Sequence, residues 1–149
     1  MAAGLSLSRE NFDRFAAEFA AEAARVLSPE LLQATIVSDG ELAASELTLA
    51  NAAALADAGP WGQAFPEPSF HGRFDLEQQR RLGENHLKMV LSPLGDPQTV
   101  IDAIAFGVSA EDWPAPEARE IELAYRLSIN EFRGNTTLQL MVEHLLGSA

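Results

Sequence analysis

The stretch over residues 59–70 separates two parts of the chain that have different hydrophobic periods. It contains three prolines, two glycines, one tryptophan and two phenylalanines. Proline fixes φ and lacks the amide donor that helices and sheets need, so the stretch cannot form a regular helix or a central strand. It is also too aromatic for a solvated linker. We therefore predict an ordered linker over residues 59–69, with Trp61 and Phe65 packed into the seam between the two parts.

Before the linker, the sequence predicts helices with a few short strands. Apolar residues recur at helical spacing over residues 9–27, which predicts an amphipathic helix. Thr48 is a suitable N-cap for a second helix that runs through Ala58. Residues 5–7 and 34–37 predict short strands. These elements predict a small α/β unit whose sheet is incomplete.

After the linker, apolar and polar residues alternate, as in β-strands with one buried face. The alternation predicts five strands, over residues 70–77, 86–91, 99–106, 121–130 and 138–142. Five short strands with an irregular connection between the third and the fourth are typical of the oligonucleotide- and oligosaccharide-binding (OB) barrel. A β-sandwich is the alternative. The predicted fold class is therefore α+β: a small α/β unit joined by the linker to a five-stranded OB-type barrel.

The composition excludes several functions. A net charge of −12 argues against attraction of nucleic acid by bulk charge, although seven of the ten cations follow the linker. The chain has no cysteine, so it forms no disulfide and no thiolate metal site. It shows no signal peptide and no apolar run long enough to cross a bilayer, so we expect a cytoplasmic protein.

The histidines do not have the spacing of a metal site. His71, His86 and His144 are isolated in the sequence, and Glu143 and His144 point to opposite faces of one predicted strand. A two-metal phosphodiesterase needs clustered carboxylates and imidazoles. Serine hydrolases of the α/β class need a Gly-x-Ser-x-Gly elbow, which this sequence lacks. We predict no catalytic, cofactor-binding or metal-binding residue in this chain.

The outward positions of the predicted barrel carry side chains suited to a nucleic-acid strand. Single-strand binders combine a cationic groove with aromatic platforms on which bases stack. The candidate residues are Arg73, Arg80, Arg81, His86, Lys88, Arg126, Phe132 and Arg133. The same residues are also compatible with ordinary solubilising side chains around a core. Trp113, which precedes Pro114, is predicted to plug one end of the barrel.

Five spaced segments carry a resemblance to known proteins: residues 1–5 (MAAGL), 59–70 (GPWGQAFPEPSF), 83–88 (GENHLK), 102–106 (DAIAF) and 130–134 (NEFRG). The first resembles the end of the Gly-Gly-His-x-x-Ala-Ala-Gly-Leu motif in the second domain (DHHA1) of DHH phosphoesterases. The others resemble, in the same order, the linker and the OB strands of the RecJ family of bacterial single-strand-specific exonucleases. Ala64-Phe65 departs from the Gly-Asn of many relatives, and nothing matches the metal-binding Asp-His-His motif.

The resemblance implies that the chain is the C-terminal region of such an exonuclease. Residues 1–58 would end its DHHA1-like domain, residues 59–69 would be the linker and residues 70–149 would form its OB domain. The whole enzyme would be a 5′–3′ single-stranded-DNA exonuclease of DNA repair and recombination that uses Mn²⁺ or Mg²⁺. This chain alone would bind no cofactor and would be inactive, because the metal-binding motifs are absent.

The resemblance also implies partners but leaves three functions open. The expected partners are single-stranded DNA, the rest of the nuclease chain, single-strand-binding protein and a RecQ-type helicase, with no membrane. The first function is a DNA-binding region. The second is a protein-interaction module for the acidic tail of single-strand-binding protein, which would use the same arginines. The third is a structural cap of the nuclease.

Overall fold

The computed structural model describes residues 4–28, 31, 35–108 and 118–149. The chain divides into two compact units, Met1–Ile36 and Val37–Ala149. The second unit therefore includes the linker and the second helix. The sequence analysis assigns that helix to the part of the chain before the linker. Trp113 lies outside the described residues. No helix in the described ranges is both long enough and apolar enough to cross a membrane.

The first unit contains one amphipathic helix. It consists of η1 (Arg9–Asn11) and α1 (Phe12–Val26), which confirms the helix predicted over residues 9–27. Apolar side chains of α1 are exposed, among them Phe12 and Phe19. The strand predicted over residues 5–7 is wrong, because no strand in the described part of this unit is available to pair with it.

The second unit begins with a segment that runs beside the first barrel strand. Residues 35–37 are not in a strand, so the described part of the strand predicted over residues 34–37 is wrong. Gly40 has a φ of 120°, which only glycine adopts readily, and it turns the chain toward the barrel. Glu41 then forms a parallel bridge with His71. The bridge therefore lies four residues after the end of the β-prone run.

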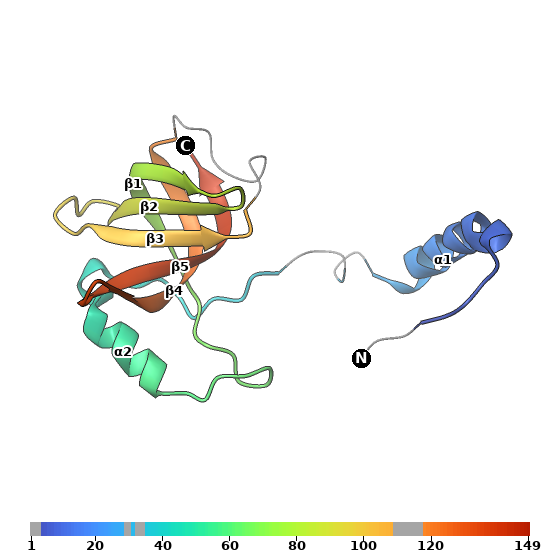
Figure 1. Ribbon diagram of the computed structural model, residues 1–149, viewed down its shortest axis with the longest axis horizontal. Helices are drawn as coiled ribbons and strands as arrows, with labels where there is room; N and C mark the ends of the chain where they lie inside the picture. Colours follow the sequence, from blue (N-terminus) through green and yellow to red (C-terminus); the bar gives the residue numbers. More distant parts are fainter. Residues whose placement is uncertain (1–3, 29–30, 32–34, 109–117) are drawn as a thin grey trace. The chain divides into compact units, whose positions relative to one another are not determined.

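The second helix, α2 (Leu49–Asp57), begins where the sequence predicts. The Thr48 side-chain oxygen accepts a hydrogen bond from the Asn51 amide at 3.2 Å, which caps the helix. α2 packs against β4, and Figure 1 shows it at one end of the barrel. Ala52 is fully buried in this contact, since the alanine-rich helix allows a close approach.

Five strands form a closed barrel (Figure 1). They are β1 (Phe70–Leu82), β2 (His86–Pro93), β3 (Ile101–Phe106), β4 (Glu120–Phe132) and β5 (Asn135–Ser148). The order around the barrel is β1-β2-β3-β5-β4, and β3 and β5 are parallel whereas the other neighbours are antiparallel. This confirms the predicted OB-type barrel and excludes the β-sandwich.

The alternating pattern places the core correctly. Leu87, Met89 and Leu91 on β2 point inward and are buried, as are Leu140 and Val142 on β5. The third strand starts two residues later than predicted. Thr99 belongs to the preceding loop, because its hydroxyl donates to the Asp96 carboxylate at 2.7 Å.

The linker is ordered and belongs to the second unit. The Trp61 indole Nε1 donates to the Leu55 carbonyl at 3.1 Å, and the half-buried ring stacks on Phe65 with centroids 4.9 Å apart. Phe65 itself is 61% exposed. The seam predicted for these two residues is therefore wrong. Trp61 docks on the last turn of α2, where the Leu55 carbonyl accepts from the Ala58 amide at 3.2 Å as well as from the indole.

Candidate nucleic-acid interface

The β1–β2 hairpin carries a cluster of exposed cations. Arg80 lies opposite Lys88 in the register of the two strands, and Leu82 lies opposite His86. Directly opposite residues of an antiparallel pair project from the same face. Because Leu87 and Met89 are buried, Lys88 and Arg80 project outward. Arg80, Arg81 and His86 are exposed, whereas Lys88 is half-buried.

The outer face continues from β2 onto β3 with an aromatic residue that the sequence analysis missed. Phe106 lies opposite His86, and the two rings meet edge to face with centroids 5.1 Å apart. The Phe106 side chain is 53% exposed. It follows the outward parity of Asp102, because Ile101, Ala103 and Ala105 are buried. That parity was the available signal, although the apolar composition of residues 99–106 obscures it.

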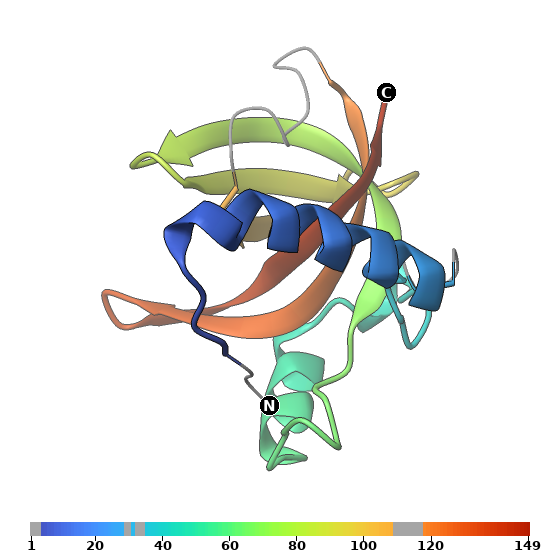
Figure 2. The same ribbon diagram turned by 90° about the vertical axis from the view of Figure 1, so that its right-hand side faces the viewer.

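The β4–β5 hairpin brings a second aromatic residue and an arginine. Arg133 and Gly134 form a two-residue turn with φ values of 52° and 82°, the primed type that twists with the strands. Phe132 is 63% exposed, and the Arg133 guanidinium carbon lies 5.1 Å from the centroid of its ring. In the view of Figure 2 the β1–β2 and β4–β5 hairpins both extend to the left, whereas Figure 1 shows their turns at opposite sides of the barrel.

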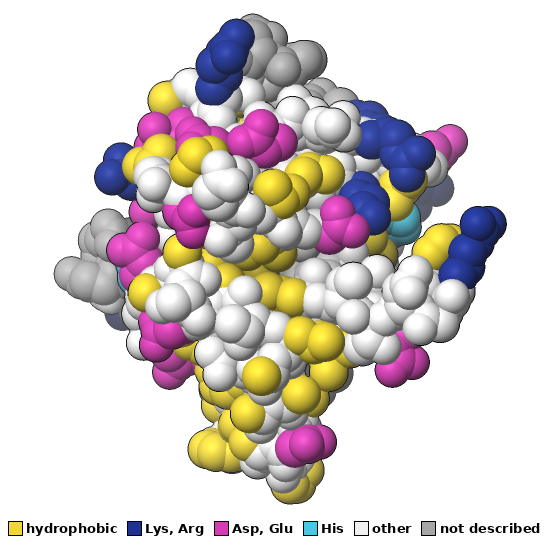
Figure 3. All heavy atoms as spheres, turned by 90° about the vertical axis from the view of Figure 1, so that its left-hand side faces the viewer, with side chains coloured by type: hydrophobic (Ala, Val, Ile, Leu, Met, Phe, Trp, Pro, Cys, Tyr) yellow, Lys and Arg dark blue, Asp and Glu magenta, His cyan; other side chains and the backbone are white. Residues whose placement is uncertain are grey.

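A recess lies in the outer face formed by β1, β2 and β3. It has a volume of about 290 Å³ and is lined by Gln78, Gln79, Arg80, Lys88, Met89, Val90 and Asp102. The Lys88 ammonium lies 2.9 Å from an Asp102 carboxylate oxygen. Figure 3 shows Lys and Arg side chains gathered on the right-hand side of the view, with a histidine and acidic side chains among them. The face is therefore locally cationic on a strongly acidic chain.

Arg126 lies on the barrel but is held by two carboxylates. Its Nη1 lies 2.6 Å from Glu67, and its Nε lies 2.8 Å from Glu143 as an ion pair without hydrogen-bond alignment. The Ser69 hydroxyl also donates to Glu143, at 3.0 Å. These contacts join the linker, β4 and β5. Arg126 consequently anchors the linker on the barrel.

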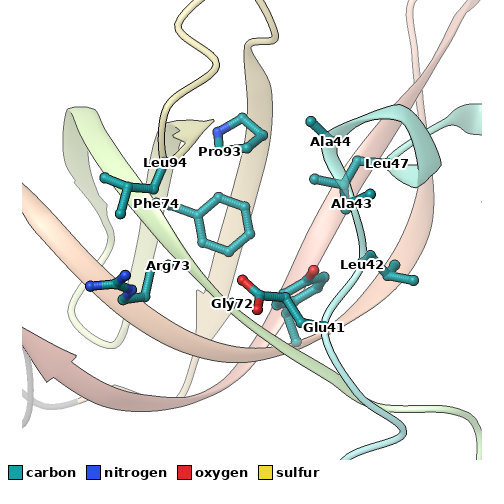
Figure 4. A pocket seen from close by; sticks show the side chains of 11 residues that line it. Glu41, Leu42, Ala43, Ala44, Leu47, Gly72, Arg73, Phe74, Pro93 and Leu94 are labelled. Atoms are coloured by element: carbon teal, nitrogen blue, oxygen red, sulfur yellow. The ribbon is translucent and has the colours of Figure 1, made fainter.

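Arg73 lies apart from the hairpin cluster, on the first half of β1. Its Nη1 lies 3.2 Å from a Glu120 carboxylate oxygen. Arg73 also borders a cleft of about 400 Å³ between residues 41–47 and the barrel. Figure 4 shows the Glu41 carboxylate directed toward the Phe74 ring within this cleft. The negative charge of Glu41 makes the cleft unsuited to a phosphate.

The buried phenol of Tyr125 also lines the cleft. Burial raises the pKa of Tyr125, and the nearby charges of Glu41 and Glu46 raise it further. Both effects disfavour the phenolate, so Tyr125 stays neutral in the folded barrel.

The described residues hold no group of three or more His, Asp or Glu side chains placed to bind a metal ion. The side chains that this face offers are cations, which suit phosphates, and exposed rings, which suit bases.

Comparison with known proteins identifies the fold family. The model of the RecJ OB domain matches residues 38–144. The chain belongs to the RecJ OB domain family. The matched range begins within the segment beside β1 and includes α2 and the linker, in agreement with the extent of the second structural unit.

Curated relatives extend the RecJ match beyond the OB domain. The single-stranded-DNA-specific exonuclease RecJ of Dickeya dadantii is 53% identical over 145 residues, and that of Escherichia coli K12 is 49% identical over 145 residues. Each alignment covers 97% of this chain but 25% of the relative. The chain thus spans about a quarter of the length of these relatives.

Solved RecJ structures have the same fold. The crystal structure of Thermus thermophilus RecJ in complex with Mn²⁺ matches with a TM-score of 0.69 and 25% identity, covering 97% of this chain and 20% of that one. The corresponding Mg²⁺ complex matches with a TM-score of 0.67 and 24% identity, covering 94% of this chain and 21% of that one.

Proposed function

We propose that this chain is the single-stranded-DNA-binding C-terminal region of a RecJ exonuclease. The observation that carries this proposal is the shared outer face of Arg80, Lys88 and Phe106, flanked by the β1–β2 and β4–β5 hairpins. OB folds bind oligonucleotides on the face of their second and third strands and on the loops 1–2 and 4–5. The cations and exposed rings of this chain occupy that same position.

The proposed binding mode follows from the chemistry of these side chains. Arg80, Lys88 and Arg133 contact phosphates, which neutralises backbone charge and releases counterions. Arg81 lies opposite Leu87 and projects from the other face of β1, so it adds a contact only at the exposed end of the hairpin. Phe106 and Phe132 provide ring faces on which bases stack, since stacking tolerates every base. Lys88 must leave Asp102 to reach a phosphate, so binding by this chain alone is weak. We expect a dissociation constant of about 1 µM or higher at physiological salt.

The whole protein is proposed to be a single-strand-specific exonuclease that digests DNA from the 5′ end in repair and recombination, in the cytoplasm. The names of the relatives support the exonuclease activity. The Mg²⁺ and Mn²⁺ complexes of Thermus thermophilus RecJ support the use of either ion by the whole protein. The described residues of this chain do not fit a metal site, so the ions would be held elsewhere in the protein.

The first unit supports the proposed place of this chain in a longer protein. The apolar face of α1 includes Phe12, Phe19 and Val26, which are all more than half exposed. A helix with such a face needs a partner surface. We propose that residues 1–58 end the DHHA1-like domain and that the upstream part of the nuclease covers this face.

The same cations would also bind an acidic peptide, such as the tail of single-strand-binding protein. Single-strand-binding protein and a RecQ-type helicase are therefore proposed as further partners.

Fluorescence anisotropy with a labelled single strand of about 12 nucleotides tests the DNA proposal, since OB folds cover about 4–16 nucleotides. We expect Arg80→Gln to weaken binding about threefold and to lower the salt slope by about 0.7.

Arg73→Gln is the matched control, because it removes the same charge from the same strand outside the cluster. We expect it to leave oligonucleotide affinity unchanged. Binding of an acidic peptide with no measurable binding of DNA would favour the protein-interaction module. Binding of neither ligand would leave only the structural cap.

A further inference from the structure

Asp102 occupies the middle of the outer face that we propose binds DNA. In the strand register it lies opposite Val90 on β2 and opposite Gln139 on β5. Its side chain is 34% exposed and that of Lys88 is 33% exposed, and their charged atoms lie 2.9 Å apart. A carboxylate at this position opposes a phosphate, so its presence requires a different explanation from that of the neighbouring cations.

The recess beside Asp102 has the polar groups of a base-binding site. Two glutamines, Arg80 and Lys88 line it together with the apolar surface of Val90. At about 290 Å³ it is slightly below the range of about 300–1,000 Å³ typical of drug-sized ligands, as expected for a smaller ligand such as one base. The exposed ring of Phe106 lies on the same strand and the same face.

DNA binding changes the partner of Asp102. When the Lys88 ammonium moves to a phosphate, the half-buried carboxylate loses its counterion. A buried charge that loses its partner is costly unless another donor replaces it. An ionised carboxylate only accepts hydrogen bonds. Where the bound strand covers Asp102 and excludes water, the replacement is a donor on that strand.

Bases differ in the donor that they offer, because thymine and uracil offer only the ring N3–H, which lies between two carbonyl oxygens. Cytosine and adenine carry an exocyclic amino group, whereas thymine and uracil present a carbonyl oxygen at the corresponding position. A carboxylate attracts the amino group and repels the carbonyl oxygen. We propose that Asp102 makes this face select bases with an exocyclic amino group over thymine and uracil. This inference rests on the proposed DNA-binding function.

Oligo(dC) and oligo(dU) of about 12 nucleotides test this selectivity most cleanly, since OB folds cover about 4–16 nucleotides. The two ligands have the same backbone and differ only in the group at the 4-position of each base and in the proton on the neighbouring N3 of uracil. Fluorescence anisotropy at mildly alkaline pH, where cytosine is unprotonated, gives both affinities. We expect about three- to tenfold tighter binding of oligo(dC) by the unmodified chain.

Asp102→Asn should remove the preference, mainly by tightening the binding of oligo(dU), because an amide both donates and accepts. Asp102→Ser should remove it as well, which guards against a folding defect specific to one variant. Glu84→Gln is the matched control, since Glu84 is exposed in the β1–β2 turn outside the recess. It should tighten both ligands and leave their ratio unchanged.

Two results would overturn the inference while the DNA-binding function stands. One is equal affinity of the unmodified chain for the two ligands. The other is a preference that persists in both Asp102 variants. If the unmodified chain binds neither ligand, the proposed function and the inference fail together.

Discussion

Replacing Trp61 by alanine tests whether the linker is anchored on α2. Trp buries about 150–250 Å² when fully enclosed. Removal of the half-buried Trp61 ring therefore loses about 100 Å² of buried apolar surface, which at about 25 cal/mol/Å² corresponds to about 2.5 kcal/mol of stability. The hydrogen bond from Nε1 to the Leu55 carbonyl contributes about 0.5–1 kcal/mol more. This contribution is small because water can bind the carbonyl when the indole is absent. We expect Trp61→Ala to lower the free energy of unfolding by about 3 kcal/mol.

Urea denaturation followed by far-ultraviolet circular dichroism measures this loss. Trp61→Phe is the first control, because it keeps a packed ring but removes the indole donor, and it should cost about 1 kcal/mol. Phe65→Ala is the second control and should cost about 1 kcal/mol, since this exposed ring contributes mainly the stacking contact. A loss below about 1 kcal/mol for Trp61→Ala, or an equal loss for Phe65→Ala, would refute the anchor.

Three further predictions follow from the ion pairs, the barrel core and the absence of a metal cluster in the described residues. Glu67→Gln should lower the free energy of unfolding by about 1 kcal/mol in urea denaturation, because the ion pair of Glu67 with Arg126 is only about one-third exposed. An unchanged free energy of unfolding at low salt would contradict the role of Arg126 as the anchor of the linker. The pKa of Tyr125, the only tyrosine, is raised, so stability is retained below the unfolded pKa of about 10 and falls as pH rises above it. Phenolate absorbance should therefore appear together with unfolding, and its appearance in folded protein would contradict the burial. The purified chain should not hydrolyse single-stranded DNA with Mn²⁺, and nucleotide release by a pure sample would refute this.

The strands were predictable because each has one buried face. Alternation of apolar and polar residues placed Leu87, Met89 and Leu91 in the core without knowledge of their neighbours. The β4–β5 turn was predictable for a similar local reason, since Gly134 adopts a positive φ. The capped start of α2 at Thr48 is equally local. Local patterns therefore determine most of the barrel.

The pairing of charges was not predictable, because it depends on the register between strands. The Lys88–Asp102 ion pair depends on the register of β2 with β3, in which Val90 lies opposite Asp102. The position of Arg80 opposite Lys88 depends on the register of β1 with β2, which shifts between Leu76 and Gln78. The contacts of Arg126 join three segments that are distant in the sequence. The predicted role of Arg126 in DNA binding is untested. That of Arg73 is untested too, and the proposed binding mode leaves Arg73 out, which the Arg73→Gln control measures.

The docking of the linker also depends on tertiary contacts. The composition of residues 59–70 predicts order but does not say which surface Trp61 contacts. The ring turned toward α2, whose last carbonyls offered an acceptor. The outward direction of Phe106 was available from the parity of β3, but an apolar strand is usually interpreted as wholly buried.

The salt dependence of oligonucleotide binding tests the central claim most directly. If three or four of Arg80, Arg81, Lys88 and Arg133 contact phosphates, the plot of log affinity against log salt has a slope of about −2 to −3, at about 0.7 for each contact on a single strand. Lys88→Glu should weaken every sequence and make the slope shallower. A slope near zero, or a slope that Lys88→Glu leaves unchanged, would contradict a cationic DNA-binding face on this barrel.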